Sequence, residues 1–267
     1  MKCEICHHNC DISENGYGFC GARKNQGGAI VCDNYGKITS LALDPIEKKP
    51  LYHFFPGSRI LSVGSYGCNM KCGFCQNFEI SQRKPRFDYI SPEKLVKIAL
   101  NESENCGVAF TYNEPTISFE YVADCAKLLK QANLKVVLVS NGQVNKTPLE
   151  QLAPLVDAWN IDVKAWNADF YRRHGGDFEA AKRAVELASK TAHVEATTLI
   201  IPGENDSDDE IAALAKWLAR LSPETPYHLS RYFPRYKYDA PPTPADLLFR
   251  LAKVAKRYLR YVYVGNV

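Results

Sequence analysis

The stretch Cys68-Asn69-Met70-Lys71-Cys72-Gly73-Phe74-Cys75 places three thiols within eight residues, shortly after an apolar run at 59–63. Three cysteine thiolates at this spacing fit an iron-sulfur cluster and leave one iron without a protein ligand. An open iron offers a position to a substrate or cofactor. Structural zinc fits the stretch poorly, because zinc normally takes four tetrahedral nitrogen or sulfur ligands at paired spacings. The motif therefore indicates an iron-sulfur enzyme.

Outward from this motif, short β-branched or apolar runs alternate with helical patterns. The expected strands are 59–63, 107–111, 135–140, 158–163, 193–200, 227–231 and 261–264, and helices are expected between them. This alternation is typical of βα units around a parallel sheet, and a chain of 267 residues can hold one such barrel. We therefore expect an α/β fold, a partial (β/α)6-type TIM barrel over residues 59–267.

Residues 1–58 have turn signals and little helical periodicity, which predicts a small cysteine-rich metal-binding module followed by a connector. Four thiols are available there, from Cys3, Cys6, Cys10 and Cys20. A bound metal would hold together a segment too small for its own core. Structural zinc is the first interpretation, a second iron-sulfur cluster the second, and a reduced module without metal the third.

The amino-acid composition argues against several classes of protein. The apolar share of 46% and charged share of 24% are ordinary for a globular chain, and a net charge of +3 gives no reason to expect nucleic acid. No apolar run is long enough to span a membrane, and the N-terminus lacks an apolar signal region, so we expect a cytoplasmic protein with no membrane partner. In a reducing compartment, ten cysteines favour metal binding over disulfides.

Polar residues follow successive predicted strands, where a barrel gathers its reacting groups. Most of them also have a simpler interpretation. Glu114 is also a favourable helix-start carboxylate, and Lys164 could form a salt bridge with Asp162. Ser140-Asn141-Gly142 also suits a turn, and His228 could be a hydrogen-bonded core histidine.

The Cys-x3-Cys-x2-Cys motif, with an aromatic residue before its last cysteine, resembles the radical S-adenosylmethionine (SAM) superfamily. The run from Gly67 to Asn77 and the later Asp162-Val163-Lys164 look like the activating enzymes of pyruvate formate-lyase. The stretch PIEKKPLYHFFPG at 45–57 resembles the radical SAM member of the group named AmmeMemoRadiSam. The resemblance covers essentially the whole chain.

This resemblance implies roles for particular residues. Cys68, Cys72 and Cys75 would bind a 4Fe-4S cluster whose fourth iron takes SAM. The other implied cofactor-binding residues are Phe74 near the adenine, Asn113 and Glu114 near the amino group, Ser140 and Asn141 near ribose or carboxylate oxygens, Asp162 and Lys164 as anchors, and Thr198 and His228 from their strand positions. Asn113 stands where the family pattern has a glycine.

The implied reaction is reductive cleavage of SAM to a 5'-deoxyadenosyl radical, with an electron from ferredoxin or flavodoxin. The radical would abstract hydrogen from a small molecule or peptide. An alternative substrate is a backbone glycine of a partner enzyme, as in activases of glycyl-radical enzymes. A different class, an iron-sulfur electron carrier or a zinc-based interaction protein, would not need polar groups at every strand end.

Overall fold

An eight-stranded sheet ordered β12-β11-β10-β9-β8-β7-β5-β4 forms the centre of the computed structural model, which describes all of residues 1–267. Every neighbouring pair from β5 to β12 is parallel, and β4 runs antiparallel to β5. The bounds are β4 Ser40–Pro45, β5 Arg59–Gly64, β7 Asn105–Phe110, β8 Lys135–Ser140, β9 Ala158–Asp162, β10 His193–Ile200, β11 Tyr227–Arg231 and β12 Val262–Gly265. This α/β architecture is consistent with the expected partial barrel.

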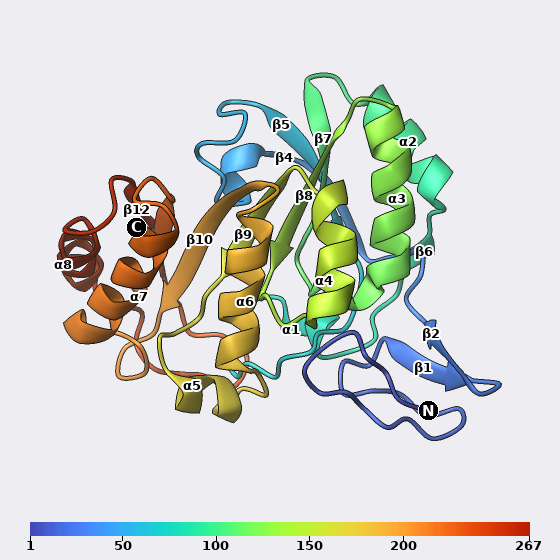
Figure 1. Cartoon of the computed structure of the whole chain (residues 1–267), viewed down its shortest axis with the longest axis horizontal. Helices are drawn as coiled ribbons and strands as arrows, with labels where there is room; N and C mark the ends of the chain where they lie inside the picture. The colour runs from blue at the N-terminus through green and yellow to red at the C-terminus, as the bar shows by residue number, and fades with distance from the viewer.

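Helices cover one face of the sheet (Figure 1). The longer ones are α2 Pro92–Asn101, α3 Phe119–Gln131, α4 Lys146–Leu152, α6 Phe178–Ala188, α7 Asp208–Leu221 and α8 Ala245–Ala255. The short ones are α1 Phe78–Ser81, α5 Ala168–Arg173 and the 3-10 turns η1 Ile46–Lys48, η2 Pro115–Ser118 and η3 Ala153–Leu155. Side-chain caps explain several starts, since Ser91, Asp177 and Ser207 each accept a hydrogen bond from a first-turn backbone N–H.

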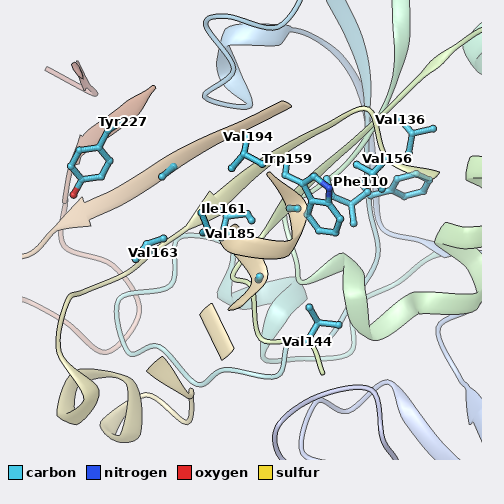
Figure 2. Packing of buried hydrophobic residues seen from close by; sticks show 14 of the residues in the cluster. Phe110, Val136, Val144, Val156, Trp159, Ile161, Val163, Val185, Val194 and Tyr227 are labelled. Atoms are coloured by element: carbon cyan, nitrogen blue, oxygen red, sulfur yellow. The ribbon is translucent and has the colours of Figure 1, made fainter. Parts of the chain in front are cut away.

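The main core lies between the sheet and these helices (Figure 2). Trp159 and Ile161 of β9 are fully buried, and Val185 of α6 belongs to the same cluster. Residues 159 and 161 share a face because side chains alternate along a strand. The remaining positions of each strand are therefore free to face the other side of the sheet, where the polar residues gather.

The N-terminal part contributes strands to three different sheets. β1 Arg23–Gln26 pairs with β2 Ala29–Cys32, and β3 Lys37–Ile38 pairs with β6 Asp88–Tyr89. β4 lies before residue 59 but belongs to the main sheet. The division at residue 58 stays a prediction, and a separate cysteine-rich module is not confirmed.

Residues 45–57, which include the extended connector expected at 45–56, pack against the N-terminal ends of the central strands. Ile46 and Leu51 are fully buried there. The Pro50 carbonyl accepts a hydrogen bond from Asn160 Nδ2 at 2.8 Å. We call this segment the plug. Elsewhere in the fold, none of the helices combines the length and the apolar character that crossing a membrane requires.

Candidate active site

A cavity of about 300 Å³ lies at the carboxyl ends of the parallel strands. All three motif cysteines line it, together with side chains from β8, β9, β10 and β11 and the segment after β7. Its volume is at the lower end of the range of about 300–1,000 Å³ for small-molecule sites. Seven of the predicted cofactor-binding residues line this cavity: Phe74, Asn113, Glu114, Ser140, Asn141, Asp162 and Lys164.

The cysteine loop is fixed by backbone contacts with distant segments. Cys68 N–H donates to the Cys20 carbonyl at 3.2 Å, and Lys71 N–H donates to the His174 carbonyl at 2.8 Å. Gly67 is required at the start of the loop, because its φ is +88° and a Cβ there would lie 2.6 Å from the Cys20 oxygen. Two segments far from the loop in sequence therefore shape it.

The loop also presents donors to its sulfur atoms. Met70 N–H lies 3.4 Å from Cys68 Sγ, and Asn141 Nδ2 lies 3.5 Å from the same sulfur. Burial raises the pKa of the Cys68 thiol well above its usual range and that of Cys72 to about 11, although Lys164 acts in the opposite direction on Cys72. Hydrogen bonds to sulfur and burial are the features that tune iron-sulfur clusters, so the loop fits such a group.

Glu114 organises the polar side of the cavity. It is fully buried, and its Oε1 accepts hydrogen bonds from Thr116 Oγ1 at 2.6 Å and from Ser140 Oγ at 2.8 Å. Its Oε2 accepts one from Asn141 N–H at 2.8 Å. Burial raises the pKa of Glu114, while these donors lower it. The carboxylate thus ties the end of β8 to the segment after β7, and it also caps η2 through Thr116 N–H.

Asn113 binds the backbone of residues 65–67 at the same side of the cavity. Its Oδ1 accepts from Ser65 N–H at 2.9 Å, and its Nδ2 donates to the carbonyls of Tyr66 and Gly67. The preceding residue, Tyr112, has a φ of +72°, which is uncommon for an aromatic residue and indicates local strain. Its carbonyl accepts a hydrogen bond from Asn77 Nδ2 at 2.9 Å, directly after the cysteine loop.

Asp162 and Lys164 form a close ion pair at the end of β9. Lys164 Nζ lies 2.6 Å from Asp162 Oδ2. Burial alone would lower the pKa of Lys164, but Asp162 and Cys72 raise it above its usual range. Asp162 Oδ1 is buried without a hydrogen-bond partner although the residue lines the cavity. This oxygen therefore lacks the hydrogen-bond donor that a buried carboxylate oxygen normally has.

The structure does not bring Thr198 and His228 to the cavity. Thr198 Oγ1 donates to the Val163 carbonyl at 2.6 Å, and the neighbouring Thr197 lines the cavity instead. His228 Nε2 is hydrogen-bonded to Glu195 Oε2 at 2.6 Å, deeper in the sheet. Neither residue lines the cavity, so their assignment to cofactor binding stays a prediction, and His228 is surrounded as a hydrogen-bonded core histidine would be.

Sequence reasoning missed several cavity residues. They are Gln76, Asn77, Thr111, Thr197, Ser230 and Asn266. The signal for Thr197 and Ser230 was present, because both are polar residues inside otherwise buried strands. Glu195 carries the same signal, since it is a fully buried carboxylate within β10.

The N-terminal cysteines lie behind the cysteine loop. Cys3, Cys6 and Cys20 are buried, and Cys10 Sγ accepts a hydrogen bond from Phe19 N–H at 3.4 Å. No group of three or more His, Cys, Asp or Glu side chains in the structure is placed to hold a metal ion. The predicted zinc is therefore not supported. The same observation does not speak against a cubane at the central motif, where each cysteine binds a different iron.

The comparisons with known proteins agree with this geometry. The sequence profile of the radical SAM superfamily matches residues 62–215. The chain belongs to the radical SAM superfamily. An uncharacterized protein of Methanocaldococcus jannaschii is 40% identical over 276 residues, which cover 100% of this chain and 81% of that protein. A second protein of that organism, provisionally named a glycyl-radical enzyme activating enzyme, is 28% identical over 76% of this chain and 79% of its own length.

Solved radical SAM structures share the fold. A radical SAM methyltransferase from Sphaerobacter thermophilus superposes with a TM-score of 0.60 at 18% identity, covering 79% of this chain and 67% of that one. A domain of a pyruvate-formate lyase-activating enzyme from Bacteroides vulgatus superposes with a TM-score of 0.52 at 18% identity, covering 60% of this chain and 99% of that one. Membership of the superfamily supports an enzyme and implies a 4Fe-4S cluster and SAM.

Proposed function

We propose that this radical SAM protein cleaves SAM reductively and uses the product radical to take a hydrogen atom from a small-molecule or peptide substrate. The observation that carries the proposal is the single cavity into which the three motif cysteines and the polar strand ends converge. When bound, the cluster would supply the electron that splits SAM into methionine and a 5'-deoxyadenosyl radical. Ferredoxin or flavodoxin is the proposed source of that electron.

The chain's own residues would bind and orient SAM. Asp162 Oδ1, buried without a partner, is suited to accept a hydrogen bond from the cofactor. The Lys164 ammonium, beside Asp162, is suited to a carboxylate. Phe74 is buried at the cavity wall and packs on the Phe170, His174 and Tyr238 rings, which favours an apolar contact with adenine.

Glu114, Ser140 and Asn141 act mainly on one another. Their mutual hydrogen bonds hold the end of β8 against the cysteine loop, and Asn141 reaches both Cys68 Sγ and Asn69 Oδ1. In the proposed enzyme these hydrogen bonds hold the cysteine loop in a fixed position relative to the cofactor site. Asn113 does the same for the backbone at Tyr66 and Gly67.

Anaerobic reconstitution with iron and sulfide, followed by dithionite and SAM, tests the proposal. We expect 5'-deoxyadenosine and methionine in equal amounts from the wild type and none from Cys72→Ser. Cys106→Ser is the matched control, because Cys106 lies at the start of β7, away from the cavity, and should keep the activity. Wild-type protein that binds the cluster but leaves SAM intact would instead support an electron carrier.

The activase of a glycyl-radical enzyme is the second candidate. Two relatives in Methanocaldococcus jannaschii, 28% and 26% identical, are provisionally named as such activating enzymes. The test is electron paramagnetic resonance on mixtures of the reconstituted enzyme, SAM and a candidate glycyl-radical enzyme. A stable glycyl radical that depends on Cys72 favours the activase. Consumption of a small molecule or modification of a peptide, without that radical, favours the first candidate.

We further infer that the chain belongs to the AmmeMemoRadiSam group within the superfamily. The segment 45–57 supports this, because the residues that resemble the group form the plug and make specific buried contacts. Lys49 is buried and donates to Asp44 Oδ2 at 2.9 Å, while the His53 backbone donates to Glu195 Oε1 at 2.7 Å. Part of the motif thus packs at the N-terminal ends of the strands and is not confined to the surface.

A further inference from the structure

The short helix α1 places a serine hydroxyl against the third cysteine of the motif. Ser81 Oγ lies 3.1 Å from Cys75 Sγ, and Ser81 is 3% exposed. The Ile80 carbonyl accepts a hydrogen bond from Gly67 N–H at 2.9 Å, which fixes α1 against the start of the cysteine loop. The hydroxyl and the sulfur are therefore held in position by the backbone on both sides.

The neighbouring Gln82 determines the direction of this hydrogen bond. Gln82 Nε2 donates to the Met70 carbonyl at 3.0 Å, so the NH2 end of the amide faces the loop. The same nitrogen lies 3.3 Å from Ser81 Oγ. Because an amide nitrogen only donates, Ser81 Oγ accepts this bond and its own proton is left for another partner. Ser81 Oγ forms no hydrogen bond to any other acceptor, which leaves Cys75 Sγ as that partner.

The chemistry of an iron ligand requires the same direction. A cysteine that binds iron is a thiolate and has no proton to donate, so Cys75 Sγ would accept and Ser81 would donate. Hydrogen bonds to a charged acceptor are roughly twice as strong as neutral ones. The donors to Cys68 Sγ, the Met70 N–H and Asn141 Nδ2, lie farther from their sulfur, at 3.4 Å and 3.5 Å. Ser81 therefore makes the shortest of these contacts with a motif sulfur.

We propose that Ser81 is a positioning residue that donates a hydrogen bond to the iron-bound Cys75 thiolate and thereby raises the reduction potential of the cluster. The proposal rests on the proposed radical SAM function and adds a residue to its electron-transfer step. A cluster becomes more negative when it gains an electron, and a donor to its sulfur stabilises the more negative state more strongly. The electron comes from the reductant, and Ser81 keeps its proton.

Potentiometric titration of the reconstituted protein without SAM tests the proposal, with the electron paramagnetic resonance signal of the reduced cluster as the readout. We expect Ser81→Ala to lower the reduction potential, because the thiolate loses its hydroxyl donor. The ratio of reduced to oxidised cluster at a fixed potential should fall about tenfold, which is about 59 mV for a one-electron couple. Ser81→Thr keeps a hydroxyl and should restore the wild-type potential.

The matched control is Ser58→Ala. Ser58 Oγ makes the same kind of contact, at 3.5 Å, with Cys106, which does not line the cavity. This variant should keep the wild-type potential. As a second measurement, electron-nuclear double resonance on protein exchanged into D2O should show a deuterium coupling that is lost in Ser81→Ala and kept in Ser58→Ala. Equal potentials and equal couplings in wild type and Ser81→Ala, or equal shifts in both alanine variants, would overturn the proposal.

This inference and the proposed function can fail separately. Wild type that forms 5'-deoxyadenosine, with a potential that Ser81→Ala leaves unchanged, overturns this inference alone. A lowered potential in Ser81→Ala, together with wild type that leaves SAM intact, overturns the proposed function and supports the hydrogen bond. A wild-type motif that binds no cluster overturns both.

Discussion

Glu114 shows how much of the site depends on one buried carboxylate. Its oxygens accept hydrogen bonds from Thr116, Ser140 and Asn141, and the residue is fully buried. In Glu114→Gln the new amide group would face at least one of these donors, so a buried donor loses its acceptor. We expect the free energy of unfolding to fall by about 1–3 kcal/mol.

Urea unfolding of the cluster-free protein measures this loss. Glu79→Gln is the control, because Glu79 is exposed and should change stability by less than about 0.5 kcal/mol. The interpretation of Glu114 as a simple helix-start residue predicts a cost near that of an ordinary cap, about 1 kcal/mol, with no effect on the β8 end. Hydrogen exchange at the Asn141 amide distinguishes the two, since only the network links that amide to Glu114.

The Asp162–Lys164 pair makes a second prediction at the residue scale. The side chains are 32% and 13% exposed, and their charged atoms are 2.6 Å apart. Asp162→Asn leaves the Lys164 ammonium without its partner, whereas the double variant with Lys164→Met leaves no charge. We expect the loss in free energy of unfolding of the double variant to be about 1–3 kcal/mol smaller than the sum of the losses in the two single variants. Urea unfolding measures all three losses.

The exposed pair Lys146–Glu150, with side chains 67% and 51% exposed, is the control for that cycle. Its coupling should be below about 0.5 kcal/mol, because solvent screens the charges. Additive effects of Asp162→Asn and Lys164→Met would contradict the prediction and show that each residue acts independently of the other.

At the element scale, the parallel strands could be predicted from the sequence. The segments that pair with these strands or pack against them could be predicted only in part. The observed bounds of β8, β10 and β11 are those expected from the sequence. β4 was missed because it mixes exposed and buried positions at the edge of the sheet. The plug was missed because its contacts join residues more than a hundred positions apart, which no local pattern records.

The site could be predicted from the sequence to the level of strand ends, but not to the level of side-chain direction. Thr198 was expected in the cavity and Thr197 is found there, because successive side chains of a strand point to opposite faces and an error of one position reverses the outcome. His228 faces the same side as Thr197, its partner in the parallel register, but its ring turns to Glu195. Only the three-dimensional arrangement reveals that partner.

The contact between the plug and β10 predicts a pH dependence. Burial would raise the pKa of Glu195, but hydrogen bonds from His193, His228 and the plug backbone at residues 52 and 53 lower it to about 2 from an ordinary value of 4.5. A carboxylate with a lowered pKa stabilises the fold fully above its unfolded pKa, and the contribution disappears as the pH falls through the folded value. The contribution of Glu195 to stability is therefore lost between about pH 4.5 and pH 2.

We expect the stability difference between wild type and Glu195→Gln to shrink by about 3 kcal/mol across that window. Urea unfolding at a series of pH values measures it. Glu150→Gln, at an exposed position, should show the wild-type dependence. A difference that stays constant from pH 5 to pH 2 would mean that these hydrogen bonds do not hold Glu195 ionised.

At the scale of the whole molecule, the N-terminal segment makes direct contacts with the cysteine loop of the candidate site. Figure 1 shows it beneath the helices, at the edge of the molecule that also carries α1. Cys20 accepts the hydrogen bond of Cys68 N–H, and His8 Nε2 lies 3.0 Å from the Asn69 carbonyl oxygen. Arg23, buried in this segment, forms a bidentate pair with Glu120 of α3, with Nη2 2.7 Å from Oε1.

The segment and the cysteine loop should therefore loosen together. Glu120→Gln leaves the Arg23 guanidinium buried without a full counter-charge, so we expect the free energy of unfolding to fall by about 1–3 kcal/mol. This loss is smaller than for a fully buried pair, because the Glu120 side chain is 41% exposed. Hydrogen exchange should become faster at residues 67–76 as well as at 20–26, because Cys68 N–H depends on the Cys20 carbonyl. Glu224→Gln, which breaks the exposed pair with Arg260, should leave both regions unchanged. Faster exchange confined to 20–26 would show that the loop is held independently of the N-terminal segment.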